Sequence, residues 1–370
     1  MIVNDYNKMN MKKLLLLCQL CLLTGSALAE GNIVSFSVKY WTVDGQTHIL
    51  SEGIDQVLTV PAEAVAVDLR GVSMLNTVFT VDHSQANPNC LYFLNRQDYV
   101  QGLDGTNMVR DNEAACISVK DGYPFYSPMS FNAQYISYLL VPQPENLWMT
   151  STGSPGFSET LVLPFSAKYA LYNDINGDAG SDNGFESDNL YVCRYVSHSE
   201  DQVQFERVAD SSLQAYQPYL LLSHLLSRLL FFAVDTEVPA TRDAVTHDDG
   251  LDFVGSTTGL PTPNSGYLFW NGGQHCFSPL VEVRLLQPFR CCMVMGQEAT
   301  GIDQETPAST TEGAVYHLMV DNVIIEQPTS ITHHRRESDI QSHFYNLLGV
   351  REAQPMKGLY ISGGRKVVVR

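Results

Sequence analysis

The sequence predicts an all-β protein made of two β-rich modules, each a sandwich or a solenoid-like sheet, followed by a short C-terminal β-hairpin tail. Short apolar runs recur about every ten to fifteen residues along most of the chain. Turn-forming pairs such as Arg70-Gly71 and Asp121-Gly122 lie between these runs. The chain has 370 residues, a length that favours two domains over one.

The first element is a leader peptide over residues 1–29. Met11-Lys12-Lys13 precedes an apolar run over 14–23, and the small residues of Ala27-Leu28-Ala29 follow. A cationic start, a short apolar core and an A-x-A site are typical of a secretory signal peptide, here cleaved after Ala29. We therefore expect an exported protein at the cell surface or in the extracellular space, with the periplasm as the alternative.

The first β module is predicted over residues 30–141. Val34, Phe36, Val38 and Tyr40 alternate with polar neighbours, and the turn pair Asp44-Gly45 follows, which predicts a hairpin. The later strand candidates are 64–69, 77–81, 90–94, 107–109, 115–119 and 134–141. Regular short strands of this kind indicate a sandwich, a barrel or a solenoid-like sheet.

A segment rich in Pro, Gly, Ser and Thr, residues 142–159, is predicted to be a linker, and a second β module is predicted over 160–296. Within that module, apolar residues of 218–232 lie at helical spacing, so that a short helix and a buried strand pair both remain open. The apolar pattern weakens over 297–341, which we predict to be mostly linker, although 315–325 has the residues for one more hairpin.

The tail, residues 342–370, contains a two-residue hairpin signal. Gly363-Gly364 lies between the strand candidates 357–361 and 365–369, whose ends carry Lys and Arg. A lone hairpin is only marginally stable in water. The tail therefore either completes a larger sheet or serves as an address, and we expect a sorting or attachment tail.

Several phrases of the sequence resemble tandem β modules of secreted, adhesin-like surface proteins from Bacteroidales-type bacteria. They include "VPAEAVAVDLRGV", "DGYPFYSPMSFNAQYISY" and "SGYLFWNGG". The tail is similar to the end of the sorting domains read by the type IX secretion system. The residues that match this tail pattern are Tyr345, Gly349, Gly358, Tyr360, Gly363, Gly364 and Lys366. The resemblance implies that the secretion machinery is a partner of the tail.

Charge and apolar content limit the function classes. The formal net charge of −18 repels phosphate backbones, so we expect no nucleic-acid partner. After the leader, the longest apolar stretch, 219–234, is shorter than the roughly 20 residues of a spanning helix, so we expect no transmembrane segment. Six cysteines follow the leader, and disulfide bridging and burial as free thiols are both open for them: Cys90, Cys116, Cys193, Cys276, Cys291 and Cys292.

An acidic stretch over 173–189 is the candidate cation site. Its oxygen-bearing residues are Asp174, Asn176, Asp178, Asp182 and Glu186. The first three are spaced as the first ligands of a calcium loop are, but Ala179 and Phe185 occupy positions where such a loop needs Gly and Glu. We therefore expect a solvated acidic loop and no cofactor. The alternative is a looser extracellular calcium site formed by Asp178, Asp182 and Glu186.

Two tryptophans are the candidate ligand-binding residues. Trp148 lies in the polar, proline-rich segment where burial is least expected, and Trp270 precedes the turn at Asn271-Gly272-Gly273. The sequence contains no G-x-S-x-G motif, whereas a pair of glycosidase carboxylates would meet only in space. We expect a non-enzymatic, adhesin-like binding protein whose ligand is a glycan or a protein. The alternative is an extracellular hydrolase that acts on glycans or peptides.

Overall fold

The computed structural model divides the chain into two compact units, residues 1–328 and 329–370, and each is described by itself. The residues that it describes are 38–51, 57–71, 80–96, 100–103, 105, 107–149, 155–173, 184–186, 188–209, 212–262, 266–279, 284–295, 315–321, 323–324, 344–345, 351–352, 358–362 and 365–369. The regular elements among them are β-strands and two short 3-10 turns, η2 (Pro144–Asn146) and η3 (Gly184–Glu186). The all-β prediction is confirmed.

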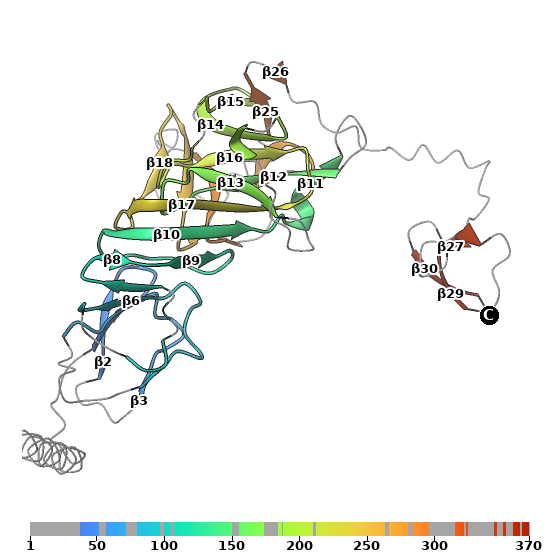
Figure 1. Ribbon diagram of the computed structural model, residues 1–370. Coiled ribbons are helices and arrows are strands. Elements are labelled where there is room, and N and C mark those ends of the chain that lie inside the picture. The colour runs from blue at the N-terminus through green and yellow to red at the C-terminus, as the bar shows by residue number, and fades with distance from the viewer. Residues whose placement is uncertain are drawn as a thin grey trace, which may run out of the picture. The chain divides into compact units, whose positions relative to one another are not determined.

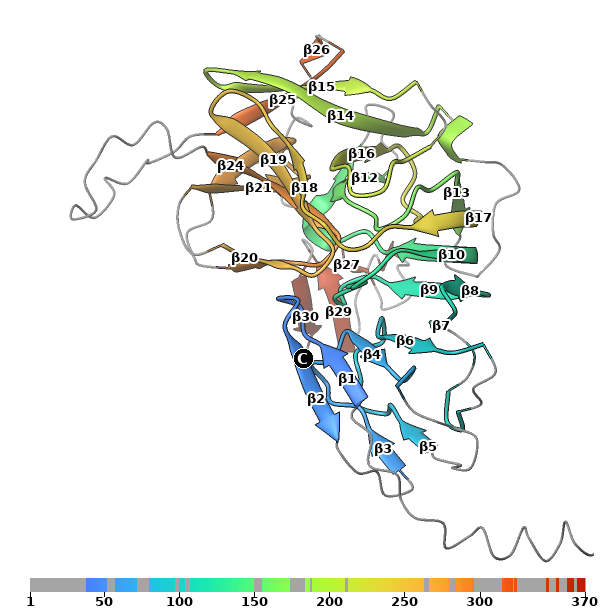
Figure 2. The same cartoon turned by 90° about the vertical axis from the view of Figure 1, so that its left-hand side faces the viewer.

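The first half of the larger unit has the winding of a solenoid. Strands β4 (Ala66–Asp68), β6 (Leu91–Leu94) and β7 (Met108–Arg110) pair in parallel. A second parallel pair joins β3 (Val57–Thr59) and β5 (Thr80–Asp82). Because β3 precedes β4 and β5 precedes β6, successive turns of the chain place one strand in each sheet (Figure 2). Parallel pairing between strands of successive turns is typical of a solenoid-like sheet, one of the architectures predicted from the short, regularly spaced apolar runs.

The predicted N-terminal hairpin borders this region. Strands β1 (Val38–Trp41) and β2 (Thr47–Ser51) pair antiparallel, and β1 also pairs antiparallel with β4. The turn uses Gly45 at a φ of +76°, a conformation that glycine adopts without steric cost. The sequence signal for this hairpin was therefore correct.

Buried asparagines hold the turns of the solenoid region to the segment that follows it. Asn89 accepts a hydrogen bond from the backbone amide of Lys120 (2.7 Å) and donates to the carbonyl of Tyr123 (2.7 Å). Asn107 accepts from the amide of Ser118 (2.9 Å). Since a buried backbone group without a partner costs free energy, these side chains satisfy groups that a tight turn leaves unpaired.

One sheet continues from the first half into the second. Strands β8 (Glu113–Ala114) and β9 (Ile117–Lys120) pair in parallel with β10 (Phe131–Leu140). On its other side, β10 pairs antiparallel with β17 (Arg228–Val238), which in turn pairs with β13 (Tyr169–Asn173). Figures 1 and 2 show these strands side by side in both views. Strand β10 is therefore the junction between the two halves.

The second large sheet is almost entirely antiparallel. In spatial order its strands are β11 (Leu147–Met149), β12 (Pro155–Leu161), β16 (Tyr219–Ser223), β14 (Leu190–Ser199), β15 (Gln202–Arg207), β25 (Tyr316–Val320), β22 (Cys276–Pro279), β21 (Tyr267–Asn271), β24 (Arg290–Met295), β19 (Leu251–Ser256) and β18 (Ala244–Thr246). Strand β26 (Val323–Ile324) pairs with β25, and β20 (Leu260–Thr262) with β23 (Arg284–Leu286). Strand β25 joins β15 in parallel.

The segment 218–232, for which the sequence allowed either a short helix or a pair of strands, contains β16 and the first part of β17. The two strands belong to different sheets, and Leu225 lies in the turn between them with 40% of its surface exposed. Strand β16 is buried along its whole length, so its run of apolar side chains reflects burial on both faces. In a nearly continuous apolar run, some residues fall at helical spacing by chance, so this spacing does not indicate a helix here.

The segment 142–159, predicted as a linker, holds η2, β11 and most of β12, and Phe157 and Glu159 within it are buried. One hydrophobic cluster extends from Ala66 to Phe289 and includes residues of both halves. Likewise β25 lies inside the predicted linker 297–341 and pairs with two strands of the second sheet. The two halves therefore share a core.

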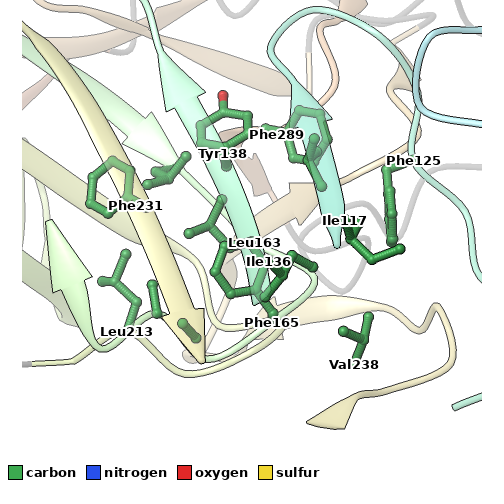
Figure 3. Close-up of a cluster of buried hydrophobic side chains, with 14 of the residues drawn as sticks. Ile117, Phe125, Ile136, Tyr138, Leu163, Phe165, Leu213, Phe231, Val238 and Phe289 are labelled. Carbon is green, nitrogen blue, oxygen red and sulfur yellow. The ribbon is translucent and has the colours of Figure 1, made fainter. Parts of the chain in front are cut away.

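Large apolar side chains fill this shared core where β10 meets its neighbours. Ile136 and Tyr138 from β10 lie among Phe165, Phe231 and Phe289, all at most 1% exposed. Figure 3 shows the Tyr138 ring within the cluster and its hydroxyl directed away from the apolar side chains. The polar end of Tyr138 therefore points out of the apolar cluster.

The cysteines of the described residues are free thiols. Cys90, Cys193, Cys276, Cys291 and Cys292 are buried, and Cys116 is half-buried. Burial raises the pKa of Cys90 to about 12 and that of Cys292 to about 12, which keeps both thiols protonated at neutral pH. The sequence allowed either disulfide bridges or buried free thiols, and the structure shows free thiols that pack as small hydrophobic side chains.

Among the described residues, no helix is long and apolar enough to cross a membrane.

The smaller unit contains four strands, β27 (Phe344–Tyr345), β28 (Arg351–Glu352), β29 (Gly358–Ser362) and β30 (Arg365–Val369). Strands β29 and β30 pair antiparallel from Gly358↔Val369 to Ser362↔Arg365, the register of the expected hairpin. Tyr345, Tyr360 and Lys366 lie on these strands. Gly349, Gly363 and Gly364 lie outside the described residues.

This separation leads to a prediction for the tail. Deleting every residue after Ser342 is expected to leave the melting temperature of the larger unit nearly unchanged, because the deleted strands pair with one another. The same deletion is expected to prevent surface display, measured by antibody labelling of intact cells. A truncated protein that unfolds would instead assign the tail a structural role.

Candidate functional site

Trp148 lies on β11 and is packed into the protein. Its ring makes edge contacts with His224 and His275, at centroid distances of 5.4 and 4.9 Å. Its indole nitrogen is buried and has no hydrogen-bond partner among the described residues. The side chain that the sequence placed in an exposed, polar segment is therefore half-buried.

Trp270, on β21, lines a cavity of about 280 Å³. The indole is half-buried and its nitrogen donates a hydrogen bond to the backbone carbonyl of Ser158 (3.2 Å), which fixes the ring against β12. Polar side chains surround it, and those that retain exposed surface are Gln143, Glu145, Asn271, Ser278 and Gln287. The cavity therefore combines two aromatic residues, Phe269 and Trp270, with amide, hydroxyl and carboxylate groups.

Glu159, on β12, forms part of the wall of this cavity and is only 1% exposed. Its carboxylate accepts hydrogen bonds from the backbone amide of Gln143 (2.8 Å) and from the side-chain amide of Asn146 (2.9 Å). The carboxamide oxygen of Asn146 accepts a hydrogen bond from the amide of Gly272 (2.9 Å). One carboxylate is thereby connected to two separate segments that border the cavity.

Gly272 permits this close contact. A Cβ atom at this position would lie 2.7 Å from Ser158 Oγ and 2.8 Å from Asn146 Cα, both closer than van der Waals contact. The turn after β21 therefore approaches η2 at a distance that only a glycine allows. The residues Asn271-Gly272-Gly273 indicate a turn in the sequence. In the structure, Gly272 is also the place where two backbone segments come into contact.

Arg290, the first residue of β24, lies beside Glu159 and is 7% exposed. Its guanidinium donates to Asp121 Oδ2 (2.8 Å) and to the hydroxyl of Tyr138 (3.0 Å), and its Nε is 3.5 Å from Glu159 Oε2. The Tyr138 hydroxyl donates to Asp121 Oδ1 (2.6 Å). The buried cluster of Asp121, Tyr138, Glu159 and Arg290 thus joins the first half of the chain to the second.

The electrostatics of this cluster set the protonation of Glu159. Burial raises the pKa of Glu159 to about 7, although the charge of Arg290 and the hydrogen bonds from Gln143 and Asn146 lower it. Arg290 has one positive charge and two carboxylate neighbours, and it lies closer to Asp121 than to Glu159. The second carboxylate is therefore incompletely compensated, and Glu159 changes its charge near neutral pH.

The structure brings together part of the residues predicted from the sequence. Trp270 lies in the cavity wall, and Trp148 is connected to it through His275, whose ring stacks on Trp270 at 6.3 Å. Asp174, Asn176, Asp178 and Asp182 lie outside the described residues. Glu186 belongs to η3. Within the described part of the chain, no group of three or more His, Cys, Asp or Glu side chains is arranged to hold a metal ion.

Glu159 and Arg290 were not among the residues predicted from the sequence. Both are charged residues inside apolar runs, "SETLVLPF" and "PFRCCMV", that read as buried strands. A charge on a buried strand needs a partner, and this is the signal that would have singled them out.

Comparison of the chain with protein-family models, with curated proteins and with solved structures finds no match.

Proposed function

We propose that the protein is an exported, adhesin-like binding protein whose cavity beside Trp270 holds an uncharged oligosaccharide. The observation that carries this proposal is the composition of the cavity wall, where an indole lies next to Gln143, Asn271, Ser278 and Gln287. Sugars present apolar C–H groups on one face and hydroxyl groups at their edge. Aromatic rings suit the first, and amide and hydroxyl side chains, which both donate and accept, suit the second.

The charge of the site favours a neutral ligand. Glu145 and Glu159 belong to the cavity wall, and the chain as a whole has a formal net charge of −18. Arg290 belongs to the same wall but is already paired with Asp121, so it offers an anionic ligand little compensation for the long-range repulsion. The leader peptide and the tail pattern support export and display, and a cavity that is open to solvent suits a ligand outside the cell.

Glu159 favours a second candidate function, that of an extracellular glycoside hydrolase. A carboxyl group with a pKa of about 7 in a cavity wall suits a general acid, and Glu145 of the same wall offers a second carboxylate. In this reading Glu159 would donate a proton to the leaving oxygen of the sugar. The hydrogen bonds that Glu159 already accepts from Gln143 and Asn146 favour a structural role instead.

A glycan array of the mature protein, residues 30–370, tests the proposal. We expect binding to uncharged glycans and, for Trp270→Ala, at least a tenfold loss of affinity, since aromatic side chains that anchor ligands contribute on this scale. Tyr123→Ala is the matched control, because Tyr123 is an aromatic residue with 48% of its surface exposed that does not line this cavity.

Melting temperatures of both variants identify any loss that is due to unfolding. A folded Trp270→Ala protein that binds with unchanged affinity would contradict the site. Release of reducing ends from a bound glycan by the wild type, abolished in Glu159→Gln, would select the hydrolase instead.

A further inference from the structure

We infer that the outer face of the sheet formed by β13, β17 and β10 is the interface through which two copies of this chain form a two-fold symmetric dimer. The apolar part of this face, called here the outer patch, consists of Tyr135, Leu139, Tyr169, Leu230, Phe232 and Val234. These residues are distinct from those that line the cavity beside Trp270, so the inference does not depend on the proposed function.

The outer patch lies on the side of the sheet that faces away from the shared core. Successive side chains of a strand point to opposite faces, and Ile136, Ala170 and Phe231, which alternate with the patch residues, are buried in that core. Figure 2 shows the three strands at the right-hand border of the larger unit. Val234 has 40% and Tyr169 has 39% of its surface exposed. The patch is therefore open to solvent.

The strand register brings the side chains of the outer patch together. Between β10 and β17, Tyr135 lies opposite Val234 and Leu139 lies opposite Leu230. An antiparallel sheet with one face on the core normally has polar side chains on its other face. A contiguous group of exposed apolar side chains on that face therefore indicates an interaction site.

The aromatic members of the patch favour a protein partner. The ring of Phe232 stacks on that of Tyr169 at a centroid distance of 4.8 Å, and the ring of Tyr135 lies 5.8 Å from it. Because β13 and β10 lie on opposite sides of β17, the two tyrosines cover both faces of the Phe232 ring. A sugar stacks on a free ring face, whereas ring edges and aliphatic side chains suit the packing of a second sheet.

Exposed cations border one end of the outer patch. Arg228 precedes Leu230 by two residues on β17 and therefore lies on the same face. Lys120 of β9 lies opposite Leu139 of β10, and its neighbour Val119 is buried on the core side. Both cations are exposed. This end of the patch is therefore positively charged.

Exposed carboxylates border the opposite end. Asp235 follows Val234 directly, and Glu237 lies two residues further along β17. Glu113 of β8 and Glu237 are both register partners of Asn132. Lys168 is a cation on the edge strand near this end, but the three carboxylates outnumber it.

These end charges have no ion-pair partner within the chain. Among the described residues, no salt bridge involves Arg228, Lys120, Asp235 or Glu237. A partner that carries carboxylates at one end and cations at the other would therefore find unpaired charges of the opposite sign on this face.

A second copy of the chain has this charge pattern. When two copies pack face to face about a two-fold axis perpendicular to the strands, the strand direction is reversed. The cationic end of each copy then meets the carboxylate end of the other, so that Arg228 faces Glu237 of the second copy in two equivalent places. An axis parallel to the strands would bring like charges together. Charge complementarity thus selects both the partner and its orientation.

Dimerisation would have a consequence for the cavity beside Trp270, and this consequence alone rests on the proposed function. Because the outer patch and the cavity wall share no residue, each dimer would carry two cavities. Two linked sites hold a repeating glycan more tightly than one site does.

Sedimentation-velocity ultracentrifugation of the mature protein, residues 30–370, without ligand tests the inference. We expect dimers to form at protein concentrations up to about 100 µM in about 0.15 M salt, which screens the long-range repulsion between two acidic chains. Val234→Lys is expected to weaken self-association at least tenfold, since it places a charge in the apolar part of both copies. Val196→Lys is the matched control, because Val196 is a strand valine with 43% of its surface exposed on β14.

A wild type that stays monomeric over this concentration range would overturn the inference, and so would equal losses in Val234→Lys and Val196→Lys. Melting temperatures of the variants identify any loss that is due to unfolding. The measurement uses no ligand, so its outcome is separate from that of the glycan array.

An exchange of charges tests the orientation of the two copies. Arg228→Glu and Glu237→Arg, made separately, are each expected to weaken self-association at least tenfold, because each places like charges opposite one another twice in the dimer. A mixture of the two variant proteins is expected to associate, because every contact then joins opposite charges. A mixture that stays monomeric would overturn the inferred arrangement. Should Val234→Lys not fold, this exchange decides the matter, since it changes only exposed side chains.

Discussion

Replacing Arg290 with methionine is expected to lower the free energy of unfolding by about 3–5 kcal/mol at pH 7.5. The guanidinium is buried and compensates Asp121, with which its Nη2 makes a contact of 2.8 Å. Methionine fills similar space but leaves Asp121 and Glu159 buried without a cation, and a buried charge without its partner is among the costliest defects in a protein. Urea unfolding followed by circular dichroism measures the effect.

Arg194→Met is the matched control for this experiment. Arg194 also pairs with a carboxylate, Glu206, but the two side chains are 61% and 40% exposed. Exposed ion pairs contribute little, so this variant is expected to lose less than about 1 kcal/mol. Equal losses in the two variants would mean that the buried cluster does not stabilise the fold in the way described.

The stability of the wild type is expected to fall by about 3 kcal/mol as pH rises from about 4.5 to 8, through the titration of Glu159 alone. The pKa of this residue is about 7 in the folded protein and 4.5 in the absence of burial, so the folded state binds the proton more tightly. Its contribution is fully present at low pH and is lost as pH rises toward the folded-state pKa.

The measurement is the difference in unfolding free energy between wild type and Glu159→Gln at pH values from 5 to 8. Taking the difference cancels groups that titrate in both proteins, such as His224, whose pKa is lowered by burial. Carboxylates with a lowered pKa, such as Asp68 beside Arg70, titrate below this range. Parallel pH profiles of the two proteins would contradict the assignment of a raised pKa to Glu159.

The strands could be predicted from the sequence because alternation and turn residues are local properties. Asp44-Gly45 and the alternating residues before it predicted the β1–β2 hairpin correctly. The partner of each strand was not predictable, because a strand in a parallel solenoid and one in an antiparallel sandwich present the same alternation. Strand β12 was predicted to be part of a linker, because its Pro, Gly and Ser residues are also typical of linkers. Its pairing with β16 depends on a segment far away in the sequence.

The candidate site was predictable only in part. Trp270 could be selected because tryptophan is rare in this chain and this one stands beside a turn. Glu159 and Arg290 come together because β12 and β24 lie near each other in space, a contact between segments far apart in the sequence. Trp148 was expected to be exposed from its polar neighbours, but strand pairing with β12 and the contact with His275 packed it inward.

The sheet that joins the two halves also affects the order in which the protein folds. On one side, β10 pairs with β9, which precedes it closely, whereas on the other it pairs with β17, so that Phe131 lies opposite Val238. Contacts between such distant segments require large loops to close first, which makes folding slow. The core that contains Phe289 and the cluster around Arg290 cannot close before β24 has been synthesised. The larger unit is thus expected to complete its folding late, after most of the chain has been made.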